Sequence, residues 1–101
     1  MQTRLIKSPT RNTIELLAGR ILPQRRERVL AEQWGAVLLV QASLPDLYTL
    51  ADLAEKAAPV VVEEITGTCP QHVSMIAAFG DTAAVEAAAR AVRETSATRS
   101  A

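Results

Sequence analysis

The chain has 101 residues, enough for one domain with a modest core, and its 11 basic and 11 acidic residues leave a formal net charge of zero. A neutral chain with three aromatic residues offers neither the basic surface nor the stacking platform that nucleic-acid binding needs. The single cysteine excludes a disulfide within the chain, which favours a reducing compartment. No apolar run approaches the roughly 20 residues that span a bilayer, and the N-terminus lacks an apolar signal core. We therefore expect a soluble, cytoplasmic protein with neither nucleic acid nor membrane as a partner.

The first third of the chain predicts a strand and two helices. Residues 3–7 favour a short strand, and Asn12 is predicted to cap a helix, with Glu15 completing a capping box. Apolar residues follow at helical spacing, and Pro23 is predicted to end this helix. The polar stretch 24–33 predicts a second, exposed helix, whose arginines face solvent or contribute to a subunit contact.

The middle of the chain predicts a central strand followed by an amphipathic helix. Residues 36–42 are a continuous apolar run of strand length, as expected for a strand covered on one or both faces. Ser43 is predicted to cap the next helix, with Asp46 in a second capping box and Pro59 closing it. The apolar face of this helix is formed by Leu47, Leu50, Ala51, Ala54 and Ala58.

The last third predicts a hairpin and a helix. The segments 60–65 and 72–80 both favour strands and flank the sequence GTCPQ, so a hairpin is the simplest interpretation. Asp81 is predicted to cap the final helix, and residues 94–101 are predicted to form a disordered tail. The inward face of that helix is predicted to hold Ala84, Val85, Ala88 and Val92.

This order of elements predicts an α+β fold of ferredoxin-like kind, with an antiparallel sheet and its helices on one face. The chain contains no internal repeat and no linker long enough to divide it. Residues 1–93 are therefore predicted to form a single domain.

The predicted hairpin loop carries the only cysteine and the only histidine, Cys69 and His72. A thiol nucleophile would need His72 as its base, but spacing at a hairpin tip does not fix that hydrogen bond, so no catalytic residue is predicted. Cys69 could instead serve as a small apolar side chain. A metal site would need about four ligands, which one chain does not supply and which several copies around a rotation axis would.

Several strings in the second part of the chain resemble the shell-protein domain of bacterial microcompartments (BMC domain). They are GAVLLVQA, AEKAAPV, VVVEEITG and FGDTAAVEAAARAV, and the resemblance covers residues 35–93. The family's closing strand, Pro-rich turn and short helix are missing after the last string, whereas a matching unit, RLIKSPTRNTIELLAG, stands within residues 1–23. The resemblance thus implies a circularly permuted BMC domain, in which residues 24–34 form a linker helix between the former ends.

The loop resembles a narrower subgroup. Gly67-Thr68-Cys69-Pro70-Gln71 is similar to the G-x-C-P-Q motif of shell proteins from glycyl-radical-enzyme propanediol-utilisation compartments. In that subgroup the motif lies at the central pore of a hexamer and is linked to binding of an iron–sulfur cluster. The resemblance implies that Cys69 is the cluster ligand, that the cluster is a labile 4Fe-4S cluster, and that the other four motif residues shape the pore loop. His72 is expected to be structural or to line the rim.

Five further residues either stand at a position that is characteristic of the family or carry a charge. Lys56 stands where the family usually keeps a lysine at the hexamer edge; the simpler alternative is an exposed lysine favoured by the helix dipole. Ser8 replaces the usual arginine of the Pro-rich turn, and Arg11 is its candidate substitute. Glu63 and Glu64 are adjacent in a predicted strand, so they should point to opposite faces and form no carboxylate pair.

Taken with the resemblance, these features imply a structural protein that is not an enzyme. It is expected to form homohexamers that tile, with other shell proteins, the shell of a bacterial microcompartment in the cytoplasm. The alternative interpretation is an oligomeric, ferredoxin-like regulatory module that binds a small molecule between its subunits.

Overall fold

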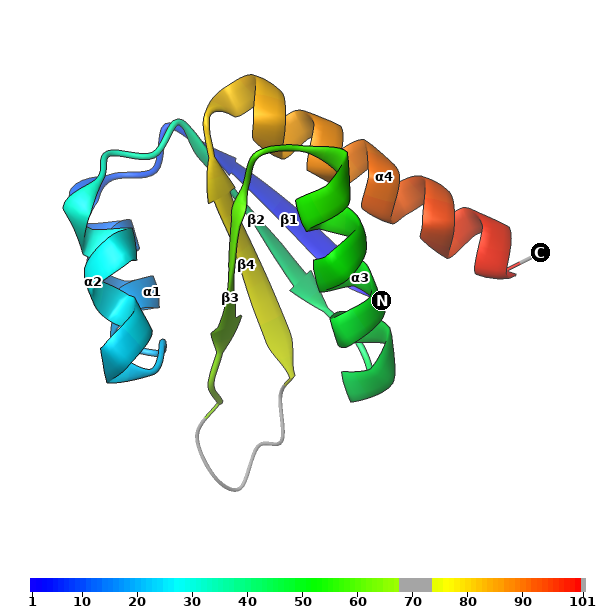
Figure 1. Ribbon diagram of the computed structural model, residues 1–101, viewed down its shortest axis with the longest axis horizontal. Helices are drawn as coiled ribbons and strands as arrows, with labels where there is room; N and C mark the ends of the chain where they lie inside the picture. The colour runs from blue at the N-terminus through cyan, green and yellow to red at the C-terminus, as the bar shows by residue number, and fades with distance from the viewer. Residues whose placement is uncertain (68–73, 101) are drawn as a thin grey trace.

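The computed structural model describes residues 1–67 and 74–100, the last five of these as backbone only (Figure 1). Its strands are β1 (Gln2–Lys7), β2 (Ala36–Gln41), β3 (Val61–Ile65) and β4 (Met75–Gly80). Its helices are α1 (Arg11–Ala18), α2 (Pro23–Ala31), α3 (Leu44–Ala57) and α4 (Thr82–Ser100). None of the helices in this described part is long and apolar enough to cross a membrane.

The four strands form one antiparallel sheet in the order β1-β2-β4-β3. The two central strands, β2 and β4, consist almost entirely of apolar residues, and nearly all of their side chains are buried. Because successive side chains of a strand point to opposite faces, burial along the whole of a strand requires cover on both faces of the sheet.

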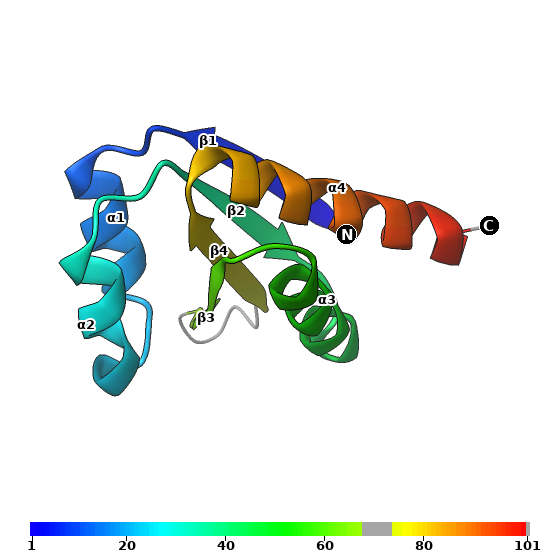
Figure 2. The same cartoon turned by 45° about the horizontal axis from the view of Figure 1, so that its top comes forward.

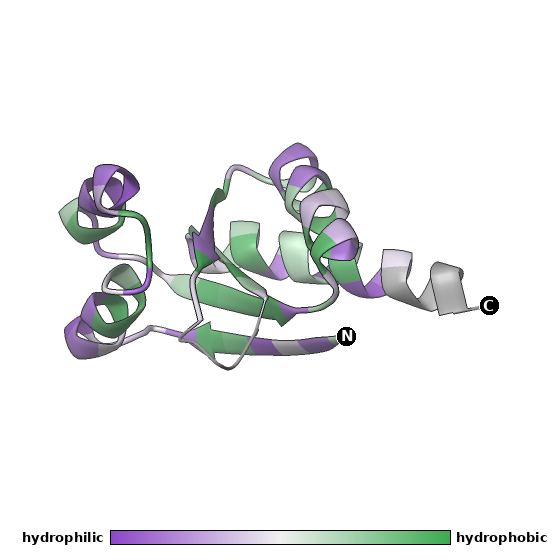
Figure 3. Ribbon diagram, turned by 90° about the horizontal axis from the view of Figure 1, so that it is seen from below, coloured by the Kyte–Doolittle hydropathy of each residue, from purple (hydrophilic) through white to green (hydrophobic). Residues whose placement is uncertain are grey.

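Two hydrophobic cores supply this cover, one on each face. Leu38 and Ala78 belong to the core beneath α3 and α4. Their neighbours Val37 and Phe79 belong to the core beneath α1 and α2, where the ring of Trp34 also contacts Phe79. Figure 2 shows the two helix pairs on opposite sides of the sheet. In Figure 3 the apolar residues of the helices and strands gather inside, and the polar residues lie outside.

The predicted α+β class, the antiparallel sheet and the β3–β4 hairpin are confirmed. The prediction of helices on one face holds for α3 and α4 only, because α1 and α2 cover the opposite face. The apolar run of β2 had left both possibilities open. Alternate side chains of β2 lie in the two different cores. A second helical layer is therefore needed to shield the second face of the sheet from water.

The ends of the first two helices differ from the prediction. Thr10, not Asn12, caps α1, and its hydroxyl accepts a hydrogen bond from the Thr13 amide. The earlier start is favoured because it adds the pair of Arg11 with Glu15 on successive turns. Pro23 begins α2 instead of ending α1, since a proline at the first helical position loses no hydrogen bond there.

The later helices agree more closely with the sequence. Asp81 caps α4 through a hydrogen bond from the Ala84 amide, as predicted, and all four predicted inward residues of α4 are buried. Ser43 is the N-cap of α3, but its side chain makes no capping hydrogen bond. Of the predicted inward face of α3, Leu47, Leu50 and Ala54 are buried and the two other alanines are partly exposed.

The predicted disordered tail is wrong as far as Ser100, because α4 continues to that residue. The stretch from Thr82 onward contains neither glycine nor proline, so no helix-ending residue interrupts it. The polar composition that suggested disorder is therefore found in the last part of a helix.

Gly35 lies where the ends of β1, β4 and α4 meet. Its amide donates to the Gly80 carbonyl, and its own carbonyl accepts from the Ser8 amide. A Cβ atom at this position would lie 2.9 Å from the Thr82 amide nitrogen and 3.1 Å from the Asp81 Cα. The start of α4 can therefore approach the sheet this closely only because residue 35 has no side chain.

We predict that Gly35→Ala lowers the free energy of unfolding by about 1–3 kcal/mol, because the added methyl group meets backbone atoms that cannot move aside cheaply. Gly19→Ala is the matched control. A Cβ there meets nothing closer than 3.5 Å and the backbone is right-handed helical, so stability should change by less than about 1 kcal/mol. Urea unfolding at one fixed protein concentration measures both; equal losses in the two variants would contradict the account.

Candidate functional site

The candidate site is the hairpin between β3 and β4 together with the strand ends that carry it. The two strands pair from Val61 with Phe79 to Ile65 with Met75, so the connection begins at Thr66. Of the motif residues, Gly67 is described and exposed. Thr68, Cys69, Pro70 and Gln71 lie outside the described residues, as does His72. The predictions for these five side chains therefore stay predictions.

The first residue of the connection is bound to the segment between α1 and α2. The Thr66 amide donates to the Arg20 carbonyl at 2.8 Å, and the Thr66 hydroxyl donates to the same oxygen at 2.8 Å. Arg20 lies in the short segment between α1 and α2. The chain that leaves the sheet toward the loop is therefore held by a segment about 46 positions earlier in the sequence.

An ion pair forms a second tie between the same elements. Glu63 of β3 is only 4% exposed, and Arg25 of α2 donates to both of its carboxylate oxygens, through Nε and through a terminal nitrogen. The hydrogen bond to the carboxylate, followed by its charge, raises the pKa of the Arg25 guanidinium. A buried carboxylate without such a partner would be costly, so the two-pronged bond makes this position tolerable for a glutamate.

Glu63 and Glu64 point to opposite faces, as predicted, since Glu63 is buried and Glu64 is exposed. Arg25 and Arg28 are exposed, as predicted for the arginines of the second helix, and Arg26 is half-buried, but two of these arginines also bind groups within the chain. Arg25 binds Glu63, and Arg26 donates to the carbonyls of Ala18, Gly19 and Ile21. These carbonyls lie at and beyond the C-terminal end of α1, where a helix leaves acceptors without partners.

Sequence reasoning missed these contacts because they join segments far apart in the chain. One signal was available: Glu63 alternates with Val61 and Ile65, so it occupies an inward position of its strand. A carboxylate at an inward position calls for a basic partner from a covering element. Which arginine supplies it depends on the packing of α2, and that packing cannot be read from the pattern alone.

Among the described residues, no group of three or more metal-binding side chains lies close enough together to hold an ion. Any metal centre in the described part of one chain would have to be completed by further copies or by residues 68–73.

Lys56 lies in the last turn of α3 and is exposed. Its ammonium group forms a salt bridge of 2.7 Å with Asp52, one turn earlier on the same helix. The hydrogen bond from Lys56, followed by the charge of Asp52, raises the pKa of the lysine above its ordinary value. Lys56 is thus charged at neutral pH and lies at the surface. Both predicted roles, a contact at the hexamer edge and a favourable charge at the end of the helix, require this.

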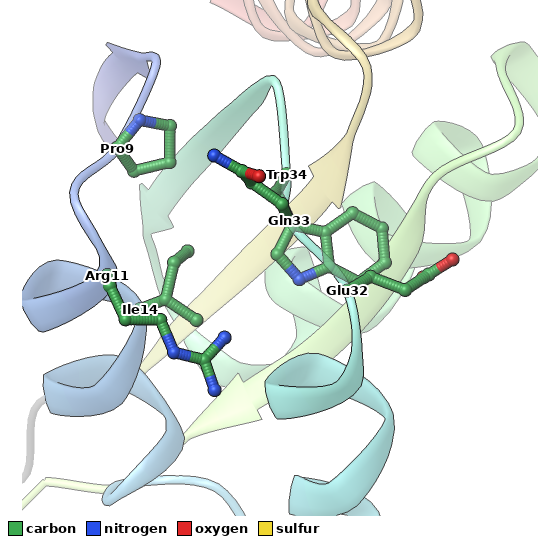
Figure 4. A pocket seen from close by; sticks show the side chains of 6 residues that line it. All are labelled: Pro9, Arg11, Ile14, Glu32, Gln33 and Trp34. Atoms are coloured by element: carbon green, nitrogen blue, oxygen red, sulfur yellow. The ribbon is translucent and has the colours of Figure 1, made fainter.

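A cavity of about 270 Å³ lies between the turn after β1 and the segment that joins α2 to β2 (Figure 4). Pro9, Ile14 and Trp34 form its apolar wall, and Arg11 is among its polar side chains. Arg11 donates to the Leu30 carbonyl at 2.9 Å and lies 3.4 Å from Glu15. The candidate substitute for the missing arginine is therefore engaged within the chain, while Ser8 adopts a φ of 50° in the preceding turn.

The protein is a small α+β domain, and the two described residues that begin its candidate loop, Thr66 and Gly67, are exposed. A comparison with protein families matches residues 38–100, more than half of the chain, to the BMC domain. The chain belongs to the BMC domain family.

Solved structures of the same family agree with this assignment. The chain is similar to the GrpU microcompartment shell protein from Pectobacterium wasabiae, with 37% identity and a TM-score of 0.73, over 91% of this chain and 99% of that one. It is also similar to the GrpU microcompartment shell protein from Clostridiales bacterium 1_7_47FAA, with 35% identity and a TM-score of 0.70, over 96% and 93% of the two chains. No curated protein matches the chain.

Membership defines the general role of the chain. BMC domain proteins are structural and not enzymatic, so the protein is a component of a microcompartment shell and not a thiol enzyme. Proteins of this family typically oligomerise and associate with other shell proteins in the bacterial cytoplasm. The family also favours this role over the alternative of a regulatory module.

The Lys56–Asp52 pair generates a prediction about charge. Because the folded-state pKa of Lys56 is raised, the stabilisation from the pair is present at neutral pH and is lost as the pH rises through that pKa. Asp52→Asn should lower the Lys56 pKa toward its ordinary value of 10.5. NMR titration of the lysine side chains measures this. Glu15→Gln, on the opposite side of the sheet, should leave the value in place; the same decrease in both variants would contradict the local cause.

Proposed function

We propose that the protein forms cyclic homohexamers that tile the shell of a glycyl-radical-type, propanediol-utilising microcompartment, with the Gly67–Gln71 loop at the central pore. The observation that carries the proposal is the likeness to two microcompartment shell proteins over more than nine tenths of the chain. The loop motif supports the subgroup. The chain is also a flat body of 39 × 35 × 19 Å, a shape suited to a thin layer.

The sheet supports a circular permutation of the domain. Starting from β2, the elements follow the order β2-α3-β3-β4-α4-β1, which is the strand and helix order of a ferredoxin-like fold. Strands β2 and β3 are both antiparallel to β4, and strands β4 and β1 are both antiparallel to β2. Each pair is therefore parallel with one strand between, as in a split β-α-β unit. The family match begins inside β2 and omits β1.

A closed ring requires contacts between two different surfaces of each subunit. Exposed apolar side chains are present beside the edge strand that leads to the loop. Leu22 and Tyr48 line one shallow hollow next to β3, and Leu44 lies one turn before Tyr48 on α3. These side chains are 45–62% exposed in the single chain, and a neighbouring subunit would cover them.

If the loop lies on the six-fold axis of the hexamer, Lys56 is in a suitable position for the outer edge of the hexamer. Lys56 is at the end of α3, directly before β3 begins at Val61, whereas the loop follows the other end of that strand. The two positions are therefore separated by the length of β3. We infer that Lys56 contacts neighbouring hexamers.

The pore loop would hold an iron–sulfur cluster through Cys69. One chain offers one thiolate, and six copies around the axis offer six, of which a 4Fe-4S cluster needs about four. A cluster with four ligand positions would not match six-fold symmetry, so it would be held by the Cys69 thiolates of part of the ring and would be labile. Such a cluster supplies one-electron transfer; the chain supplies the thiolates and the backbone of the rim.

We predict that protein purified without oxygen contains iron, absorbs visible light, and has the native mass of a hexamer. Cys69→Ser should remove the iron and the absorbance while the hexamer persists, because the side chain is needed for ligation and not for assembly. His72→Asn is the matched control and should retain the iron.

The two parts of the proposal can fail separately. A colourless, iron-free preparation that is still hexameric would contradict the cluster and leave the shell role intact. A monomer at high protein concentration would contradict the ring, and with it the cluster, which needs several copies.

A further inference from the structure

Two bonded contacts and one shared core join the α1–α2 unit to β3 and the residue after it. Arg25 binds Glu63, and the Arg20 carbonyl accepts both hydrogen bonds from Thr66. Between these contacts in the sequence, Ile21 and Ile65 belong to the same buried core. The Thr66 contact lies beyond the end of the strand.

The α1–α2 segment is itself rigidly held. Arg26 donates to the carbonyls of Ala18, Gly19 and Ile21, so one guanidinium closes the turn in which Arg20 lies. Ile21, next to Arg20, is 2% exposed, and Ile65, next to Thr66, is 5% exposed, so each partner of this contact adjoins a residue buried in the same core. The Arg20 carbonyl is thus a fixed acceptor.

We propose that the α1–α2 unit is a brace that fixes the chain where the loop begins, with Arg25 and Thr66 as positioning residues. The ladder between β3 and β4 ends at the pair of Ile65 and Met75, so it does not hold the next residue, Thr66. The two bonds from Thr66 to the Arg20 carbonyl hold it instead. The importance of this anchor rests on the proposed function, because thiolates that converge on an axis need a fixed point from which the loop starts.

The competing explanation is that these contacts only stabilise the fold as a whole. A brace should affect hydrogen exchange at the loop alone, whereas general stabilisation should affect it throughout the protein. Thr66 is exposed, so Thr66→Val should fold while it loses the hydroxyl donor. Arg25→Gln removes the two-pronged bond to Glu63. Arg28→Gln, an exposed arginine on the same helix, is the matched control.

The experiment is hydrogen exchange of the full-length protein, followed by mass spectrometry of peptides that cover residues 66–74 and of peptides that cover β2. In Thr66→Val and Arg25→Gln, exchange over 66–74 should become about three- to tenfold faster while β2 is unchanged. Arg28→Gln should match the wild type, and Arg25→Lys should restore only part of the protection because it lacks the planar fork. Iron per hexamer should fall in the two brace variants.

Unchanged exchange over 66–74 in both brace variants would overturn the proposal, and so would equal acceleration in β2, since that describes general destabilisation. The exchange measurement does not depend on iron. Wild-type protein without iron would therefore contradict the pore cluster and not the brace, whereas wild-type iron content in both brace variants would contradict the brace and not the cluster.

Discussion

The burial of both faces of the two central strands is the constraint on which the rest of the structure depends. β2 and β4 place alternate side chains in two separate cores, so neither helical pair alone can shield the sheet from water. The pair α3 and α4 belongs to the part of the chain that matches the family, and α1 and α2 come from the N-terminal part. The N-terminal segment is thus an integral layer of the domain.

This second layer also brings the N-terminal part to the loop. The face that α1 and α2 cover includes the inward positions of β3, and one of those positions is a glutamate. The same packing that buries Ile65 sets Arg25 against Glu63 and the Arg20 carbonyl against Thr66. The packing of α1 and α2 on the sheet therefore both buries the core and holds the start of the loop. A substitution on α2 that disturbs this packing should change the structure at Thr66.

Local patterns in the sequence predicted most of the fold, and contacts between distant segments account for what they missed. The apolar run of β2, the hairpin and the Asp81 cap each depend on a few neighbouring residues, and all three were predicted correctly. Thr10 and Asn12 are both residue types that cap helices and are two positions apart, and the choice of Thr10 depends on the following turn. For the candidate site, the sequence identified the loop motif and Lys56, but the ties from Arg25 and Thr66 span 38 and 46 positions.

In the proposed assembly, copies of the chain meet around a rotation axis at the end of the β3–β4 hairpin. An experimental structure of the assembled protein, prepared without oxygen, would show this axis. We expect six-fold symmetry, with Gly67 near its symmetry copies at the axis and Lys56 on the outer perimeter. A ring in which the hairpins point outward, or an assembly without cyclic symmetry, would contradict it.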